Sequence, residues 1–289
     1  YELERRQEKL DNIKHSDCNN CWTCEEKGVR SQRKPEPFYE AHRSRFNVPR
    51  GTEVLPTFLE LYFNNTCDLK CIYCNNQFSS QWEAELRKFN EPFETMKDDT
   101  NGLLKETFYK WFETQGCENI LTYNILGGEP TIQNDFYEFT DYLIDALSRI
   151  PNRHNIKPEI CITTNGHTPD RYINKFMDTL DKLSKHMSIR IDFSNGSVGK
   201  RAEFVRSNLD WNIFEKNVNR IAEFSKGKDI RIRFNCAHTA ITVPTFIDFL
   251  KWAHNIRKQY DIKIAFATNT VVEPSNLSPW NLTEDFKKN

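Results

Sequence analysis

The stretch CDLKCIYC, residues 67–74, follows the apolar run TFLELYF, residues 57–63, after three polar residues. The apolar run has the aromatic and aliphatic composition of a buried β-strand. Cys67, Cys71 and Cys74 therefore lie on the loop after that strand. Folds with parallel strands carry their working residues on the loops at the carboxyl ends of the strands, so we expect this loop at the active face.

Strand-like and helix-like segments alternate along the rest of the chain. Further strands are expected at residues 118–126, 158–166, 187–196, 229–236 and 262–268. Helices with one apolar stripe are expected between them, at residues 136–147, 173–183, 211–224 and 245–254. This repetition predicts an α/β fold with parallel strands, either an open doubly wound sheet or a partial (β/α) barrel. Residues 82–102 interrupt the alternation and are expected to leave the barrel.

Composition excludes several classes of protein. Lys plus Arg number 40 and Asp plus Glu number 41, so no net field draws the chain to nucleic acid. No run approaches the roughly 18 apolar residues of a membrane span. The nine cysteines are an odd number, and six of them fall in two clusters. That usage favours metal-bound thiolates in a reducing compartment over a disulfide framework, and it predicts a cytoplasmic location.

The spacing Cys-x3-Cys-x2-Cys at residues 67–74 supplies three thiolates rather than four. A structural zinc site is normally closed by four ligands, commonly as two Cys-x2-Cys pairs. Three thiolates suit a 4Fe-4S cluster whose fourth iron stays open for a substrate or cosubstrate. By spacing alone, a zinc loop or a set of buried structural cysteines remains an alternative.

Two motifs together resemble the radical S-adenosylmethionine (SAM) superfamily. CxxxCxxC at 67–74 follows the first strand, with an aromatic residue before its last cysteine, and GGEP at 127–130 is similar to the family's GGE motif. The resemblance covers about residues 53–270 and implies a partial (β/α)6 barrel. It also implies the chemistry: a 4Fe-4S cluster cleaves SAM reductively, and the resulting 5′-deoxyadenosyl radical abstracts a substrate hydrogen.

The resemblance assigns roles to residues near the first two strands. Gly127 and Gly128 would let the backbone approach the methionyl group of SAM, and Glu129 would accept hydrogen bonds from its ammonium group. Tyr73 would lie beside the adenine; a tyrosine of the core is the alternative.

Later motifs carry further candidates. Asn165 in TTNG would contact SAM or cap a turn. RIDFSNG is similar to the family's RISIDS-like stretch, with Asp192 where Ser is common and Ser194 where Asp is common. Arg206 in EFVRSNLDW would pair with the SAM carboxylate; an arginine in a surface salt bridge is the alternative.

A second cysteine cluster, Cys18, Cys21 and Cys24, precedes the barrel. Its surroundings resemble the CxxCWxxExxGxxSxR element of radical SAM proteins with a C-terminal twitch (SPASM-like) extension. Paired cysteines predict a second metal, either zinc with His15 as a further donor or an auxiliary iron-sulfur cluster. Free thiols are the alternative. The remaining cysteines are expected to be small core residues: Cys117, Cys161 and Cys236.

These features predict three regions: an N-terminal extension at 1–52, a radical SAM barrel at 53–270, and a truncated twitch-like start at 271–289. The expected function is that of a radical SAM oxidoreductase or transferase acting on a peptide or protein, with flavodoxin or ferredoxin as electron donor. A nucleotide or other small-molecule substrate is one alternative, and a noncatalytic metal-binding or interaction protein is another. Membrane and nucleic-acid partners are not expected.

Overall fold

The expected alternation of strands and helices is present in the computed structural model, which describes residues 19–26, 28, 55–94, 102–151, 156–283 and 285. The chain divides into two units, residues 1–54 and 55–289. In the first unit the described part is helix α2 (Asn19–Glu26) with Gly28. The second unit holds the sheet and the motifs discussed below.

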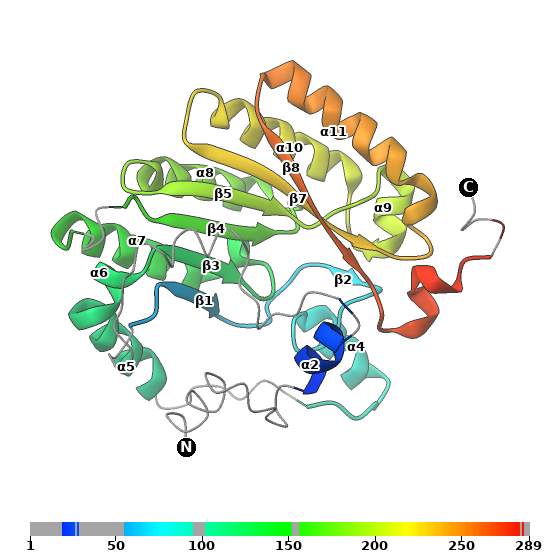
Figure 1. Cartoon of the computed structure of the whole chain (residues 1–289), viewed down its shortest axis with the longest axis horizontal. Helices are drawn as coiled ribbons and strands as arrows, with labels where there is room; N and C mark the ends of the chain where they lie inside the picture. Colours follow the sequence, from blue (N-terminus) through cyan, green and yellow to red (C-terminus); the bar gives the residue numbers. More distant parts are fainter. Residues whose placement is uncertain are drawn as a thin grey trace. The chain divides into compact units, whose positions relative to one another are not determined.

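Six parallel strands form the main sheet (Figure 1). Their order across the sheet is β1 (Phe58–Tyr62), β3 (Thr122–Leu126), β4 (Glu159–Thr164), β5 (Ser188–Phe193), β7 (Ile230–His238) and β8 (Ile264–Thr270). This is also their order along the chain, whereas a doubly wound sheet reverses its strand order at a switch point. The partial barrel is therefore confirmed, and the doubly wound alternative is wrong.

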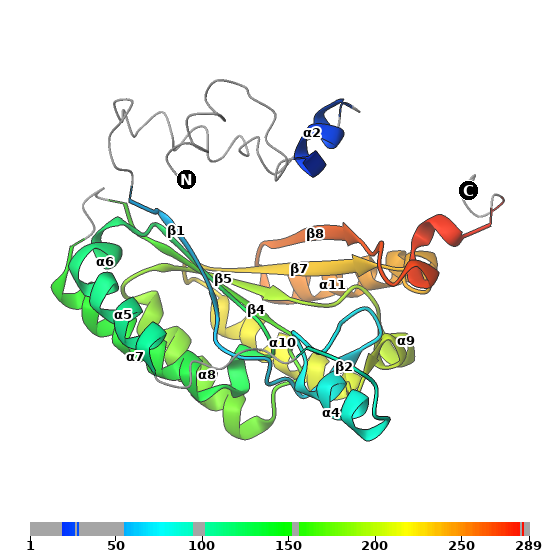
Figure 2. The same cartoon turned by 90° about the horizontal axis from the view of Figure 1, so that it is seen from below.

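The helices between the strands cover one face of the sheet (Figure 2). They are α7 (Asn134–Arg149), α8 (Asp170–Ser184), α10 (Trp211–Ser225) and α11 (Phe246–Tyr260). Each turns its apolar stripe to the sheet, and the fully buried core includes Ile125, Phe139, Ile162, Phe176, Ile189, Phe214, Phe234 and Phe249. No helix in the described part combines the length and the apolar character needed to cross a bilayer.

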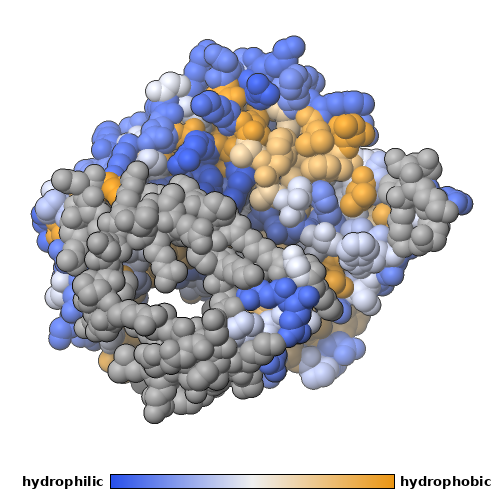
Figure 3. All heavy atoms as spheres, in the orientation of Figure 1, coloured by the Kyte–Doolittle hydropathy of each residue, from blue (hydrophilic) through white to orange (hydrophobic). Residues whose placement is uncertain are grey.

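The opposite face of the sheet is polar along its middle strands. Side chains alternate between faces along a strand, so Arg190 and Asp192 point away from the helices that bury Ile189 and Ile191. Asp192 is paired there with Arg190 at 3.2 Å and with Arg233 of β7. Figure 3 shows hydrophilic atoms on this part of the molecule and apolar atoms gathered over β7 and β8. A closed barrel would fill this face with packed apolar layers.

Several local elements differ from the prediction. Residues 118 and 119 belong to a short helix, α6 (Cys117–Asn119), so the strand expected from residue 118 begins at Thr122. Helix α4 (Ser80–Lys88) begins two residues before the interrupting segment expected at 82–102 and extends into it, and α5 (Leu103–Trp111) follows that segment. Two segments far apart in sequence, β2 (Lys70–Cys71) and β6 (Arg206–Ser207), pair as a small antiparallel sheet after helix α9 (Gly199–Val205).

Candidate functional site

The cysteine loop is held in place by the start of helix α4. Three side-chain donors bond to carbonyl oxygens of the loop: Ser79 Oγ to Leu69 at 2.7 Å, Ser80 Oγ to Cys67 at 3.2 Å, and Trp82 Nε1 to Cys71 at 2.8 Å. The Leu69 side chain is fully buried beneath the loop. These contacts satisfy backbone groups that would otherwise need water, so the loop keeps its path through protein contacts alone.

The three cysteines of the loop are free thiols. Cys71 is buried, and Cys67 and Cys74 are half-buried. Burial raises the pKa of all three thiols, that of Cys67 to about 12. Metal ligation requires thiolates, so a metal that binds here must release protons.

The side chains of the loop are not gathered into a single-ion site in this structure. Among the described residues, no three His, Cys, Asp or Glu side chains lie close enough together to hold one metal ion. A tetrahedral zinc draws its sulfur ligands close, at about 2.3 Å from the ion. The ligands of a cubane stand farther apart because each binds a different iron. The closed zinc loop left open by the spacing stays an alternative to the cluster.

Arg206 lies beside the cysteine loop and has no acidic partner in the described part of the chain. The pairing of β2 with β6 sets Arg206 opposite Cys71. Its side chain is buried, its Nη1 donates to Tyr73 Oη at 2.6 Å, and its Nε has no partner among the described residues. The surface salt bridge considered as an alternative is therefore wrong. A buried cation without a counter-charge is unfavourable, so the position suits an anionic group.

The GGEP turn packs directly against the cysteine loop. Glu129 N donates to Thr66 O at 2.8 Å, and Gln133 Nε2 donates to the same oxygen at 2.9 Å. Gly127 and Gly128 have φ values of 80° and 53°, and a Cβ on Gly128 would collide with Thr66 O. The protein itself therefore requires glycine here, whether or not a ligand approaches the turn.

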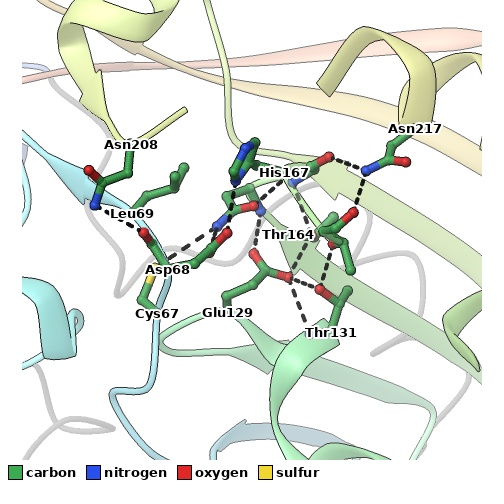
Figure 4. A network of polar contacts seen from close by, with 12 residues as sticks. Cys67, Asp68, Leu69, Glu129, Thr131, Thr164, His167, Asn208 and Asn217 are labelled. Atoms are coloured by element: carbon green, nitrogen blue, oxygen red, sulfur yellow. Dashed lines mark hydrogen bonds and ion pairs between the residues drawn. The ribbon is translucent and has the colours of Figure 1, made fainter. Parts of the chain in front are cut away.

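Glu129 is fully buried at the centre of a polar network (Figure 4). Its Oε1 accepts from Thr131 N, Thr131 Oγ1 and Thr164 Oγ1, and its Oε2 accepts from Asn165 N at 2.6 Å. Burial and the charge of Asp68 raise the pKa of Glu129 to about 7, against the opposing effect of these hydrogen bonds. A carboxylate offers about four lone-pair positions, so Oε2 keeps one for an ammonium group.

Asn165 joins the third strand's turn to the cysteine loop. Its Nδ2 donates to Asp68 Oδ1 at 2.7 Å and lies 4.0 Å from Cys67 Sγ. His167 Nδ1 bonds to Asp68 Oδ2 at 2.9 Å, and the second ring nitrogen of His167 is buried without a partner among the described residues. Asp68 lies inside the motif CDLKCIYC and His167 directly follows TTNG, but neither residue could be predicted as part of the site, because no local signal shows that the two loops meet.

The candidates after β5 have unequal support. Both oxygens of Asp192 are engaged by arginines of the sheet, which leaves it little capacity for a ligand. Ser194 is half-buried, and its backbone N–H bonds to Thr164 O at 2.8 Å. Two residues that sequence reasoning missed follow: Asn195 and Ser197 are buried, and the Asn195 Nδ2 and Ser197 Oγ atoms have no partner in the described part of the chain.

Comparison with known families agrees with this geometry. A model described as the Radical SAM superfamily matches residues 61–226, more than half of the 289 residues. The chain belongs to the radical SAM superfamily. Members of this superfamily are enzymes, and this radical SAM fold implies SAM and a 4Fe-4S cluster as cofactors.

Several solved structures are similar to this chain at low sequence identity. The anSMEcpe structure with bound AdoMet is 18% identical with a TM-score of 0.47, over 73% of this chain and 50% of that one. Streptococcus suis SuiB bound to SAM is 17% identical with a TM-score of 0.43, over 100% and 65%. The methyltransferase TsrM from Kitasatospora setae is 10% identical with a TM-score of 0.44, over 74% and 36%. The chain thus spans about half the length of anSMEcpe, and no curated protein matches it significantly.

The residues of this radical SAM protein fit both cofactors. Three thiols on one loop are the soft ligands that iron prefers, and the Arg206 guanidinium, which has no acidic partner among the residues described, suits a carboxylate. A polar ligand would satisfy buried polar atoms that have no partner within the described ranges, on His167, Asn195 and Ser197.

The N-terminal cysteine cluster is only partly described. Helix α2 carries Cys21, a half-buried free thiol. Cys18, His15 and the side chain of Cys24 lie outside the described residues, so a second metal stays a prediction. The other three cysteines are buried free thiols: Cys117, Cys161 and Cys236.

Proposed function

We propose that Cys67, Cys71 and Cys74 hold a 4Fe-4S cluster and that SAM binds beside it. The observation that carries this proposal is Arg206, a buried guanidinium with no acidic partner among the described residues, next to three free thiols. When bound, the cluster and SAM supply a 5′-deoxyadenosyl radical that abstracts a hydrogen atom from the substrate.

The surrounding residues of the chain bind and orient SAM. The Arg206 fork pairs with the SAM carboxylate, and Tyr73 Oη holds the guanidinium in that orientation. The remaining lone pair of Glu129 Oε2 receives the ammonium group, at the turn formed by Gly127 and Gly128. Such separate sites for the two charges of an amino acid fix its direction of binding.

Polar groups at the end of β5 contact the rest of SAM. The buried amide of Asn195 and hydroxyl of Ser197 have unused hydrogen-bonding capacity, as a ribose would need. They take this role in preference to Asp192, whose oxygens are already paired, while Ser194 stays a candidate.

A narrower proposal concerns the substrate and the donor. The CxxCWxxExxGxxSxR-like element around Cys21 supports membership of the twitch/SPASM-like subgroup and, with it, a peptide or protein substrate. Cluster reduction then requires a low-potential donor such as flavodoxin or ferredoxin. The N-terminal extension at 1–52 and the twitch-like start at 271–289 belong to this proposal.

Anaerobic reconstitution tests the proposed site. The protein is loaded with iron and sulfide, treated with dithionite and SAM, and assayed for 5′-deoxyadenosine and for iron, sulfide and zinc content. Wild-type protein should release 5′-deoxyadenosine, and Cys71→Ala should abolish both the release and the cluster at residues 67–74. Cys117→Ala is the matched control, because it removes a buried free thiol outside the loop and should preserve both. A colourless protein that holds only zinc would refute the proposal.

A further inference from the structure

We propose that Asn165 donates a hydrogen bond to the Cys67 sulfur and raises the reduction potential of the cluster, and that Asp68 and His167 are positioning residues for its amide. This inference rests on the proposed function, because it needs a cluster on Cys67. It gives a role to the Asp68 carboxylate and to the Nδ1 side of the His167 ring, which the proposed SAM contacts do not include.

The orientation of the Asn165 amide is determined from both ends. Its Oδ1 accepts from the backbone N–H of His167 at 2.7 Å, so the oxygen faces the turn. Its Nδ2 faces Asp68 Oδ1 at 2.7 Å, and an ionised carboxylate only accepts hydrogen bonds. One amide hydrogen is thus directed to Asp68, and the other is left for Cys67 Sγ, 4.0 Å away.

Asp68 is itself held by His167. The His167 ring bonds through Nδ1 to Asp68 Oδ2 at 2.9 Å, so both carboxylate oxygens have a partner and the side chain cannot rotate freely. The turn that carries His167 is fixed by α10, where Asn217 Nδ2 donates to Gly166 O at 3.0 Å and to Thr168 O at 2.8 Å. Buried Asn165 is therefore held between Asp68 and a turn that is itself hydrogen-bonded to α10. Figure 4 shows Asp68, His167 and Asn217 of this arrangement.

A donor in this place changes the redox balance of a bound cluster. Reduction adds negative charge, which spreads onto the ligating sulfurs. A hydrogen bond to one of those sulfurs stabilises the reduced form more than the oxidised form, and such bonds are among the determinants of cluster potential. The neighbouring Asp68 carboxylate would otherwise oppose reduction, and its two hydrogen bonds offset part of its charge.

The test measures the midpoint potential of the reconstituted cluster without SAM, by redox titration followed by EPR. Asn165→Ser keeps a side-chain oxygen for the His167 N–H but removes the second donor hydrogen. We expect at least a tenfold lower ratio of reduced to oxidised cluster at fixed potential, which is a 59 mV more negative midpoint for one electron. His167→Ala should shift the midpoint in the same direction by less, since Asp68 then orients the amide less firmly.

Asn208→Gly is the matched control. Asn208 Nδ2 donates to the backbone oxygen of Asp68 at 3.3 Å and does not contact a cysteine sulfur in the structure. Its φ of 76° suits glycine, so the change removes a contact with the same loop without backbone strain. The midpoint potential of this variant should equal that of wild type.

The iron and sulfide content of each protein distinguishes failure of the proposed function from failure of this inference. If wild-type protein takes up no cluster, the proposed function fails and this inference with it. If Asn165→Ser holds a full cluster at the wild-type potential, the inference alone is refuted. If Asn165→Ser does not hold a cluster, pulsed EPR of wild-type protein and His167→Ala in D2O provides the test. A deuteron that couples to the reduced cluster in wild type, and whose coupling weakens in His167→Ala, supports the inference. The absence of such a deuteron in wild type overturns it.

Discussion

At the scale of single residues, the environment of Arg206 indicates a role in ligand binding rather than in stabilising the fold. A buried cation that served the fold would be paired with a carboxylate, because desolvation of an unpaired charge opposes folding. Within the residues that the structure describes, Arg206 instead has one hydrogen bond, to the hydroxyl of Tyr73, and its Nε has no partner. Its position opposite Cys71 is therefore explained by what binds there rather than by what holds the chain together.

Arg206→Met tests this distinction. An apolar side chain of similar volume removes the buried charge, so we expect the free energy of unfolding of the cluster-free protein to stay within about 1 kcal/mol of wild type or to rise. SAM affinity of the reconstituted protein should fall by roughly 10- to 100-fold, because a charge-assisted bond of about 1.5–3 kcal/mol is lost. Denaturant melts and calorimetric titration measure the two quantities.

Lys216→Met is the control for Arg206→Met. Lys216 forms an exposed pair with Asp170, so its loss should change neither quantity by more than about 0.5 kcal/mol. Severe destabilisation of Arg206→Met with unchanged SAM affinity would show that the guanidinium serves the fold.

At the scale of elements, the GGEP turn shows how a motif can be structural and functional at once. The turn connects β3 to the rest of the site and delivers Glu129, whose hydrogen bonds reach the turn after β4. The left-handed backbone at Gly128 is what lets Glu129 N reach Thr66 O in the cysteine loop. The GGEP motif thus connects its own turn to the cysteine loop and to the turn after β4 through hydrogen bonds.

Gly128→Ala should disrupt the contact between the GGEP turn and the Thr66 carbonyl. The change adds left-handed strain of about 1–2 kcal/mol and a collision with the Thr66 carbonyl oxygen, so the free energy of unfolding should fall by more than about 2 kcal/mol. Gly199→Ala is a matched control: its φ is 54°, but no atom lies within 4 Å of the added Cβ, and it should show the strain alone. If urea melts showed the same loss of unfolding free energy for both variants, the Thr66 carbonyl would have moved aside at no energetic cost, contrary to this prediction.

At the scale of the whole molecule, stability should depend on pH through a histidine at the end of β7. Burial lowers the pKa of His238, and its Nε2 has no hydrogen-bond partner among the described residues. Its ring packs edge-on against the ring of Phe246, and the two ring centroids are 4.5 Å apart. The fold therefore favours the neutral imidazole, and protonation favours the unfolded chain.

His238→Phe removes this titration and preserves the aromatic contact. For wild type, the stabilising preference for neutral His238 is fully present above the ordinary histidine pKa near 6.5 and is lost as pH falls through the lower folded value. The unfolding free energy of wild type should therefore fall relative to the variant on acidification below about pH 6.5. Parallel profiles for the two proteins from pH 8 to pH 5 would contradict the assignment.

Most of the fold could be predicted because its signals are local. The alternating run at β5 and the apolar stripe of α8 each report their own environment, and right-handed crossovers then place the strands. The two-residue strands β2 and β6 could not be predicted, since nothing in Lys70–Cys71 indicates a partner more than a hundred residues away. Residues 118–119 were misjudged because the polar pair Glu118 and Asn119 directly precedes the strand's apolar residues, and no local signal marks the residue at which the strand begins.

The sequence by itself determined the family-like motifs, the parallel architecture and the edge of the sheet where the cysteines and GGEP meet, because periodicity and spacing are properties of a segment. Tertiary structure alone decided that Arg206 is buried with no acidic partner among the described residues, that Asp192 pairs with Arg190 and Arg233, and that Asp68 bonds to His167. Burial and pairing depend on which distant segments come together, and no single segment carries that information.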